Sequence, residues 1–198
     1  MAKSADAGDE PIKARYEYRV WGEHKKARKK LANLATEETR QEIEDCYLIG
    51  DDPEWNAKIR DDELKVKQLI GEEKGFEQWT SEWHETSDTA PKPYDALFNQ
   101  LRLDRPQRGK SFDVFKAVAK LDPDTGARAV FVTKRRRRYR LGSIKAEVTD
   151  VEIHGSDEVM RTLSIEGSDL DELVALRKTL GLRDETNLPM HVAIDGGS

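Results

Sequence analysis

The chain of 198 residues has a single cysteine and no long apolar run, and each of these features excludes a class of protein. One cysteine, Cys46, rules out an intramolecular disulfide framework and is typical of a reducing compartment, so we expect a cytoplasmic location. No apolar stretch approaches the roughly 20 residues that a membrane-spanning helix needs. The first 13 residues contain no hydrophobic segment, and we expect no secretory signal there.

Hydrophobic residues are also scarce. They make up 36% of the chain, while charged residues make up 37%, well above the roughly 25% that is typical of globular proteins. The net charge of −5 argues against a protein that coats nucleic acid without sequence preference. The four histidines are scattered without the short spacing of metal ligands. The length predicts one domain, which we place at residues 14–194, with disordered ends at 1–13 and 195–198.

The segment AVFVTKRRRRYR, Ala129–Arg140, stands out against this acidic background. It begins as a β-branched and aromatic run, which predicts a strand, and it continues into six basic residues without glycine or proline. Side chains alternate between the two faces of a strand, so Lys134, Arg136 and Arg138 share one face while Arg135 and Arg137 take the other. Cations in a row repel one another, and we expect an anion to lie opposite them.

Other segments alternate in the same way and predict a protein built mainly of strands. The expected strands are Arg15–Trp21, Arg40–Ile49, Glu54–Arg60, Glu63–Ile70, Phe76–Glu85, Ala129–Arg140, Ser143–Ile153 and Met160–Glu166. The expected helices are Glu23–Leu34, Pro91–Leu103, Ser111–Leu121 and Asp169–Leu180. Asp169 should cap the last helix and Gly181 should end it, while residues 91–121 form a helical insertion.

One face of these strands is apolar or aromatic, and the other carries charge. The cations of the charged face are Arg19, Lys58, Arg60, Lys65, Lys67, Lys134, Arg136 and Arg138. Glu17, Glu147 and Glu166 supply carboxylates on the same face. Seven or eight antiparallel strands are enough to close a barrel, so we predict an α+β fold: a closed antiparallel β-barrel with a charged lumen and helices packed on the outside.

A triphosphate suits such a lumen, because its oxygens need several guanidinium and ammonium donors. The eight cations of the charged face would bind it. Carboxylates on the same wall would hold Mg²⁺ or Mn²⁺, with Glu17, Glu147, Glu166 and Asp150 as ligands.

At these residues the chain resembles the CYTH domain, the core of the triphosphate tunnel metalloenzymes, over roughly residues 15–182. That superfamily includes inorganic triphosphatases, thiamine triphosphatases and class IV adenylyl cyclases. The segments that carry the resemblance are Glu17-Tyr18-Arg19 for the opening Glu-x-Glu-x-Lys motif, Lys58-Ile59-Arg60 and Lys65-Val66-Lys67 for a cationic hairpin, Lys134-Arg135-Arg136 for Lys-x-Arg, and Ser164-Ile165-Glu166 for a late Glu-x-Glu. The resemblance implies Mg²⁺-dependent hydrolysis of a triphosphate in a closed tunnel, with Glu17, Glu147 and Glu166 as catalytic residues.

The sequence departs from the motifs on the acidic side: the opening motif lacks one acidic residue, and Ser164 stands where a glutamate is expected. Three functions therefore stay open, namely a triphosphatase, a non-catalytic module that binds polyphosphate or a phosphorylated ligand, and a nucleic-acid binder. A plainer alternative is that the glutamates are only counter-ions of the arginines. A homodimer also stays open.

Overall fold

A computed structural model describes residues 15–84, 94–104, 114–121 and 127–196 of the chain. The predicted disordered segment 1–13 lies outside these residues, as do the first residues of the two helices predicted in the insertion. No helix in the described part of the chain is both long and apolar enough to cross a bilayer.

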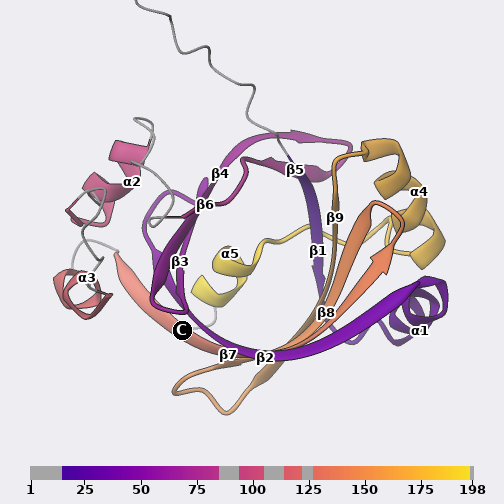
Figure 1. The fold of residues 1–198 in the computed structure, drawn as a ribbon, viewed down its shortest axis with the longest axis horizontal. Helices are drawn as coiled ribbons and strands as arrows, with labels where there is room; N and C mark the ends of the chain where they lie inside the picture. The colour runs from indigo at the N-terminus through magenta and orange to yellow at the C-terminus, as the bar shows by residue number, and fades with distance from the viewer. Residues whose placement is uncertain (1–14, 85–93, 105–113, 122–126, 197–198) are drawn as a thin grey trace, which may run out of the picture.

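Eight antiparallel strands form a closed ring, which confirms the predicted fold class (Figure 1). The ring runs β3-β2-β7-β8-β9-β1-β5-β4, and β4 pairs with β3 to complete it, while the short β6 pairs with β4 alongside. The strands are β1 (Arg15–Trp21), β2 (Glu37–Ile49), β3 (Trp55–Arg60), β4 (Glu63–Glu73), β5 (Phe76–Trp79), β6 (Trp83–His84), β7 (Arg128–Leu141), β8 (Ile144–Ile153) and β9 (Val159–Gly167). Every predicted strand is present, and only the Phe76–Glu85 segment divides into two.

The outer face of the barrel holds most of the hydrophobic core. Helices α1 (Lys25–Leu34) and α4 (Leu170–Leu180) cover β1, β8 and β9, where Leu31 and Leu173 are fully buried against Tyr18 and Leu163. Helix α2 (Asp95–Gln100) covers β3 and β4 in a second cluster, and α3 (Val114–Lys120) follows it. Burying a large apolar side chain contributes roughly 1.5–3 kcal/mol, so these contacts hold the helices to the barrel wall.

The ends of α4 follow the predicted capping chemistry. The Asp169 carboxylate accepts a hydrogen bond from the backbone N–H of Glu172 at 3.0 Å, and Gly181 ends the helix with φ 77°, a left-handed conformation that glycine adopts without strain. Both residues were identified from the sequence, and both roles are confirmed.

One helix lies inside the barrel, which the sequence analysis did not anticipate (Figure 1). Helix α5 (Met190–Asp195) buries Met190 and Ile194 against inward-facing residues of β2, β7 and β8, among them Val132 and Val151. The prediction of a disordered tail from Asp195 is wrong for Asp195 itself. This residue belongs to α5, and its carbonyl accepts a hydrogen bond from the Arg128 guanidinium at 2.6 Å. The interior thus has two parts, an apolar part filled by α5 and a charged part.

Candidate functional site

The charged part of the interior is a cavity of about 370 Å³, within the range of ordinary ligand pockets. Nine cationic side chains and five glutamates line it. The cations are Arg15, Arg19, Lys58, Arg60, Lys67, Lys134, Arg136, Arg138 and Lys145, and the glutamates are Glu17, Glu77, Glu82, Glu147 and Glu166. The cavity therefore carries an excess of positive charge although the whole chain is acidic.

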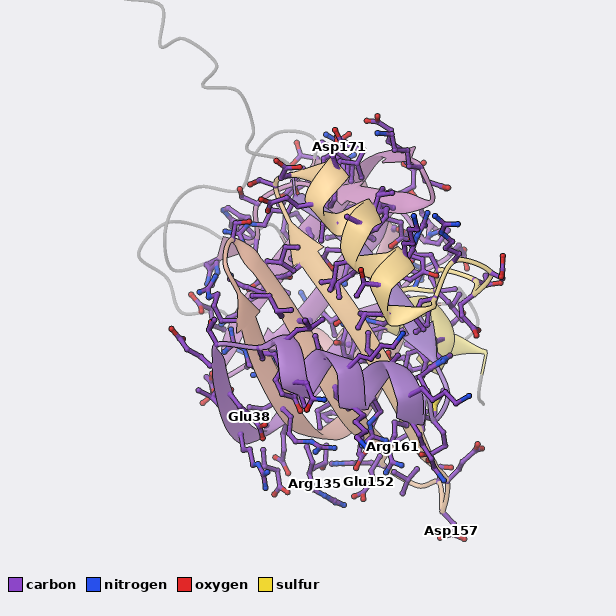
Figure 2. All side chains as sticks on the ribbon, turned by 90° about the vertical axis from the view of Figure 1, so that its right-hand side faces the viewer. Glu38, Arg135, Glu152, Asp157, Arg161 and Asp171 are labelled. Atoms are coloured by element: carbon purple, nitrogen blue, oxygen red, sulfur yellow. The ribbon has the colours of Figure 1, made fainter. Side chains whose placement is uncertain are left out.

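Strand β7 places its basic residues by simple alternation. Lys134, Arg136 and Arg138 point into the cavity, as the sequence predicted. Arg135 lies on the outer surface beside Glu152 of β8, its ion-pair partner (Figure 2). The same strand thus contributes one row of cations to the interior and another to solvent.

The glutamates of the cavity come from adjacent strands. Glu17 of β1 is the register partner of Glu166 in β9 on one side and of Glu77 in β5 on the other. Glu147 of β8 lies opposite Ser164 of β9, one row further along the sheet. Register partners share a face of the sheet, so these carboxylates line one wall of the cavity.

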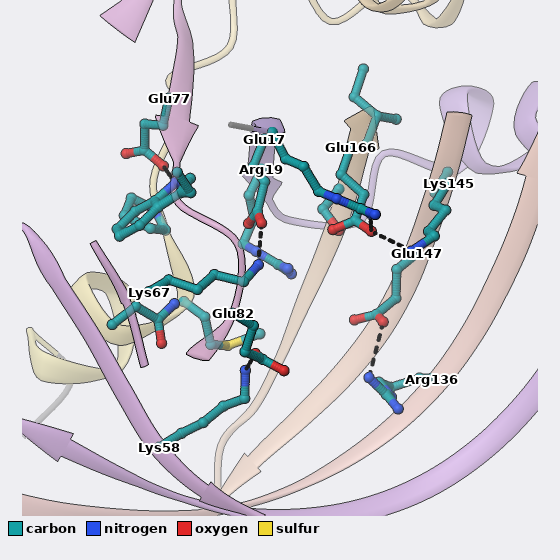
Figure 3. A pocket seen from close by; sticks show the side chains of 18 of the residues that line it. Glu17, Arg19, Lys58, Lys67, Glu77, Glu82, Arg136, Lys145, Glu147 and Glu166 are labelled. Carbon is teal, nitrogen blue, oxygen red and sulfur yellow. Dashed lines mark hydrogen bonds and ion pairs between the residues drawn. The ribbon is translucent and has the colours of Figure 1, made fainter. Parts of the chain in front are cut away.

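Four of the five cavity glutamates have a cationic partner among the described residues (Figure 3). Lys67 donates to Glu17, Lys58 donates to Glu82, and the Arg136 Nη1 atom lies 3.3 Å from Glu147 Oε2. Glu166 lies 3.4 Å from the Lys145 ammonium and 3.7 Å from the Arg15 guanidinium. These ion pairs offset the desolvation of charge inside the barrel.

The protonation states follow from these contacts. Burial opposes the charged form of Glu17 and of Glu82, yet Lys67 and Lys58 outweigh it and lower both pKa values, that of Glu82 to about 2. Glu77 lacks such a partner: burial raises its pKa to about 7, the hydrogen bond from Trp79 opposes this, and the charge of Glu17 adds to it. The pKa of Glu77 therefore lies close to neutrality.

Ten of the twelve site residues predicted from the sequence line the cavity. Lys65 does not, although it is the register partner of Lys58; its ammonium lies 3.4 Å from Glu63. Asp150 also does not, because it has the opposite strand parity to Glu147 and binds Arg161 on the outer face. The prediction of Asp150 as a metal ligand is corrected by this placement.

Glu77, Glu82 and Asp45 were not predicted as site residues, and neither were the cations Arg15 and Lys145, which also line the cavity. Glu77 alternates correctly in a predicted strand but matches no motif. Strict alternation along the predicted strand Phe76–Glu85 puts Glu82 on the face opposite Glu77, and the structure differs because β5 ends at Trp79 and the alternation stops there. Asp45 lies in a predicted strand and shares a strand face with Tyr47, two residues away. Only the structure shows that this face points into the barrel, because Tyr47 packs in the interior cluster.

Asp45 is the most completely buried of these carboxylates. Its side chain is 0% exposed and accepts two hydrogen bonds from Arg60, Nε to Oδ1 at 2.6 Å and Nη2 to Oδ2 at 2.7 Å. It also contacts the Lys134 ammonium, which donates to the Tyr47 hydroxyl at 3.0 Å. This network lies where the charged part of the interior meets the part filled by α5.

We expect the Asp45 network to make the folded state sensitive to acid. Burial alone would raise the pKa of Asp45, but the hydrogen bonds from Arg60 and the charge of Lys134 lower it from 3.8 to about 2. The ionised carboxylate therefore stabilises the fold above about pH 4, by about 2 kcal/mol, and this contribution is lost as the pH falls through 2. Urea unfolding at about pH 5 and about pH 2.5 should show a larger loss for the natural protein than for Asp45→Asn; equal losses would contradict the assignment.

The resemblance implies a divalent cation, and the carboxylates test whether one fits. Among the described residues, no three His, Cys, Asp or Glu side chains form a group that could hold a metal ion. Glu17, Glu147 and Glu166 share a wall, but each faces a lysine or arginine instead of a common point. This arrangement does not fit a preformed Mg²⁺ or Mn²⁺ site, and we derive no step through a metal.

No family model and no curated protein sequence matches the chain. Solved structures do match. The PH1012 protein from Pyrococcus horikoshii OT3 aligns with a TM-score of 0.53 at 18% identity, covering 90% of this chain and 98% of its own. A conserved hypothetical protein from Pyrococcus furiosus aligns with a TM-score of 0.50 at 18% identity, covering 89% and 96%. HpAC1 from Hippeastrum, which has a dominant triphosphatase activity, aligns with a TM-score of 0.47 at 12% identity, covering 93% and 95%.

At these identities the likeness shows a shared fold. The alignments cover nearly the whole length of the two Pyrococcus structures, so the shared fold includes the connections between strands as well as the barrel. The predicted fold, a closed antiparallel β-barrel, is thereby confirmed.

Proposed function

We propose that this chain binds a triphosphate, inorganic or attached to an organic group, inside the β-tunnel. The observation that carries the proposal is the set of nine lysine and arginine side chains that five strands direct into one cavity. Arginine and lysine donors that converge in a partly desolvated space bind phosphate oxygens strongly. A linear triphosphate offers several anionic oxygens in a row, which suits cations spread along a tunnel wall.

The cavity carboxylates pair with the cations when no ligand is bound, and a ligand can replace them. Without a ligand, Glu17, Glu82 and Glu147 neutralise Lys67, Lys58 and Arg136. A bound triphosphate would compete for the same donors, and the excess of cations allows it to bind without displacing every pair. The site is therefore preorganised by its own ion pairs, which lowers the cost of ordering side chains on binding.

Hydrolysis of the bound triphosphate, dependent on Mg²⁺ or Mn²⁺, is the second candidate. Glu17, Glu147 and Glu166 reach the cavity from the three adjacent strands β1, β8 and β9, and they would hold the cation only after releasing the lysine and arginine side chains with which they pair. The competing non-catalytic module would keep the cations and use these glutamates only as counter-ions. Binding nucleic acid is the weakest alternative, because the row of Lys134, Arg136 and Arg138 faces the interior of the barrel.

A thermal-shift panel with tripolyphosphate, ATP, thiamine triphosphate and long-chain polyphosphate tests the proposal. A ligand present at 100 times its Kd adds about 2.7 kcal/mol, which should raise the Tm by roughly 5–10 °C for a chain of this size. Inorganic monophosphate is the control, because it offers the same oxygens without a chain. No shift with any of the four ligands would contradict binding.

The same samples, incubated with and without Mg²⁺, distinguish the two candidates. Release of phosphate that needs Mg²⁺ and disappears in Glu147→Gln supports hydrolysis. A shift in Tm that is independent of Mg²⁺, with no phosphate released from any ligand, supports the non-catalytic module.

A further inference from the structure

Asp45 differs from the other acids of the tunnel in that it is close to the site without lining it. It lies on β2, which contributes only Tyr47 to the wall of the cavity, and its side chain is 0% exposed. A fully buried carboxylate is costly unless all its oxygens are engaged. Here both oxygens are engaged, and every partner is a cation that does line the cavity.

The geometry of these contacts fixes both cations. Arg60 presents its Nε and Nη2 atoms to the two Asp45 oxygens at 2.6 and 2.7 Å, a two-point contact that sets the plane of the guanidinium. Lys134 is held between Asp45 and the Tyr47 hydroxyl. One anion that holds two cations leaves one positive charge in excess within this group, and both cations line the cavity.

We propose that Asp45 is a positioning residue, which fixes the Arg60 guanidinium and the Lys134 ammonium as a preformed anion-binding pair at the α5 end of the cavity. The inference rests on the proposed function, since it supposes that an anion binds in the tunnel. Asp45, although it lies outside the cavity wall, would thereby determine where one end of that anion binds.

The variant Asp45→Asn distinguishes a positioning role from that of a passive counter-ion, because the two roles predict opposite changes in anion affinity. Asp45→Asn removes a negative charge beside the site. If Asp45 only offsets charge, the variant makes the tunnel more positive, and anion binding should strengthen. If Asp45 positions Arg60 and Lys134, the variant loses the two-point contact and its hold on the lysine, and binding should weaken.

The experiment measures the Kd of tripolyphosphate by calorimetry for the natural protein, Asp45→Asn, Asp45→Glu and the control Asp171→Asn. We expect Asp45→Asn to weaken binding roughly tenfold or more, the range found for residues that orient ligand-contacting groups. Asp45→Glu keeps the charge but moves the carboxylate, and it should weaken binding as well. Asp171→Asn breaks an exposed ion pair with Lys74 and should leave the Kd unchanged.

The pH dependence of the Kd adds a measurement that general damage to the fold would not alter. Burial lowers the pKa of Lys134 to about 8 against the opposing charge of Asp45; Arg60 lowers it further, and Glu147 raises it. Affinity should therefore fall as the pH rises through about 8. In Asp45→Asn this fall should move to lower pH, because the lysine loses its counter-charge. Lys134→Met gives the baseline, since the ligand still titrates but the lysine does not.

The outcomes separate the two proposals. If the natural protein does not bind tripolyphosphate or any other triphosphate, the proposed function fails, and the role of Asp45 fails with it. If the natural protein binds and a folded Asp45→Asn binds equally well or more tightly, only the role of Asp45 is overturned. Should Asp45→Asn not fold, Asp45→Glu decides by the same comparison, and unchanged affinity in that variant overturns the inference.

Discussion

Replacing Arg136 by glutamine is expected to weaken tripolyphosphate binding roughly 100-fold, while the same change at Arg135 should alter it less than about twofold. The two residues are neighbours on β7, yet they belong to different environments. Arg136 lines the cavity with its side chain only 10% exposed, and it donates to Gln41 at 2.6 Å as well as pairing with Glu147. Removing it deletes a buried donor and takes away one of the cations that stabilise the Glu147 carboxylate.

Arg135 provides the matched control, because it has the same side chain one position away. It pairs with Glu152 and lies 3.9 Å from Glu42 on the exposed outer surface, where ion pairs contribute little to stability or to binding at a distance. Titration calorimetry on both variants gives the ratio directly. Equal losses would contradict the assignment of the faces, and a larger loss of duplex DNA binding at Arg135 would favour the nucleic-acid alternative.

The alternation of residues was enough to predict the barrel. Glu17 and Arg19 against Tyr18 and Val20, or Lys58 against Ala57, already separate a charged face from an apolar one, and a one-residue slip would expose the whole core. Eight such strands with a charged face can bury that face only around a lumen. The side of the sheet on which each cation lies therefore followed from local sequence alone.

Features that depend on pairs of distant elements could not be predicted in this way. Asp45 acquires its partners only when β2 lies between β3 and β7, because Arg60 and Lys134 come from those two strands. Glu82 enters the cavity because β5 ends early, and strand ends depend on tertiary context. The metal ligands were inferred from carboxylates that share the charged face of the strands, and in the structure these side chains form ion pairs with lysine and arginine instead.

Helix α5 was missed for a related reason: it has only six residues, and its apolar positions find their partners on strands that are distant in sequence. The residues on the inward face of β7 explain why α5 lies inside the barrel. It carries Val130 and Val132 before Lys134, so the interior changes from apolar to cationic along a single strand. An apolar half without a helix would leave a cavity lined by valine and isoleucine.

Replacing Ile194 by alanine should therefore destabilise the protein by about 2–5 kcal/mol, the cost of truncating a fully buried isoleucine. Ile194 is 1% exposed and packs in the cluster of Tyr47, Val132 and Val151. The Tm should fall by roughly 5–15 °C, as measured by calorimetry or circular dichroism. Val159→Ala is the control, because Val159 is half exposed and its truncation should change stability by less than about 0.5 kcal/mol.

The position of α5 also connects stability to the site. Pro189 and Met190 line the cavity at the end where Lys134 and Tyr47 lie, so the start of the helix forms part of the cavity wall. If Ile194→Ala and Val159→Ala lower stability equally, α5 does not fill the barrel. If Ile194→Ala alone is destabilising, α5 fills the apolar part of the barrel, and a ligand that binds the folded state should raise the Tm of this variant as well.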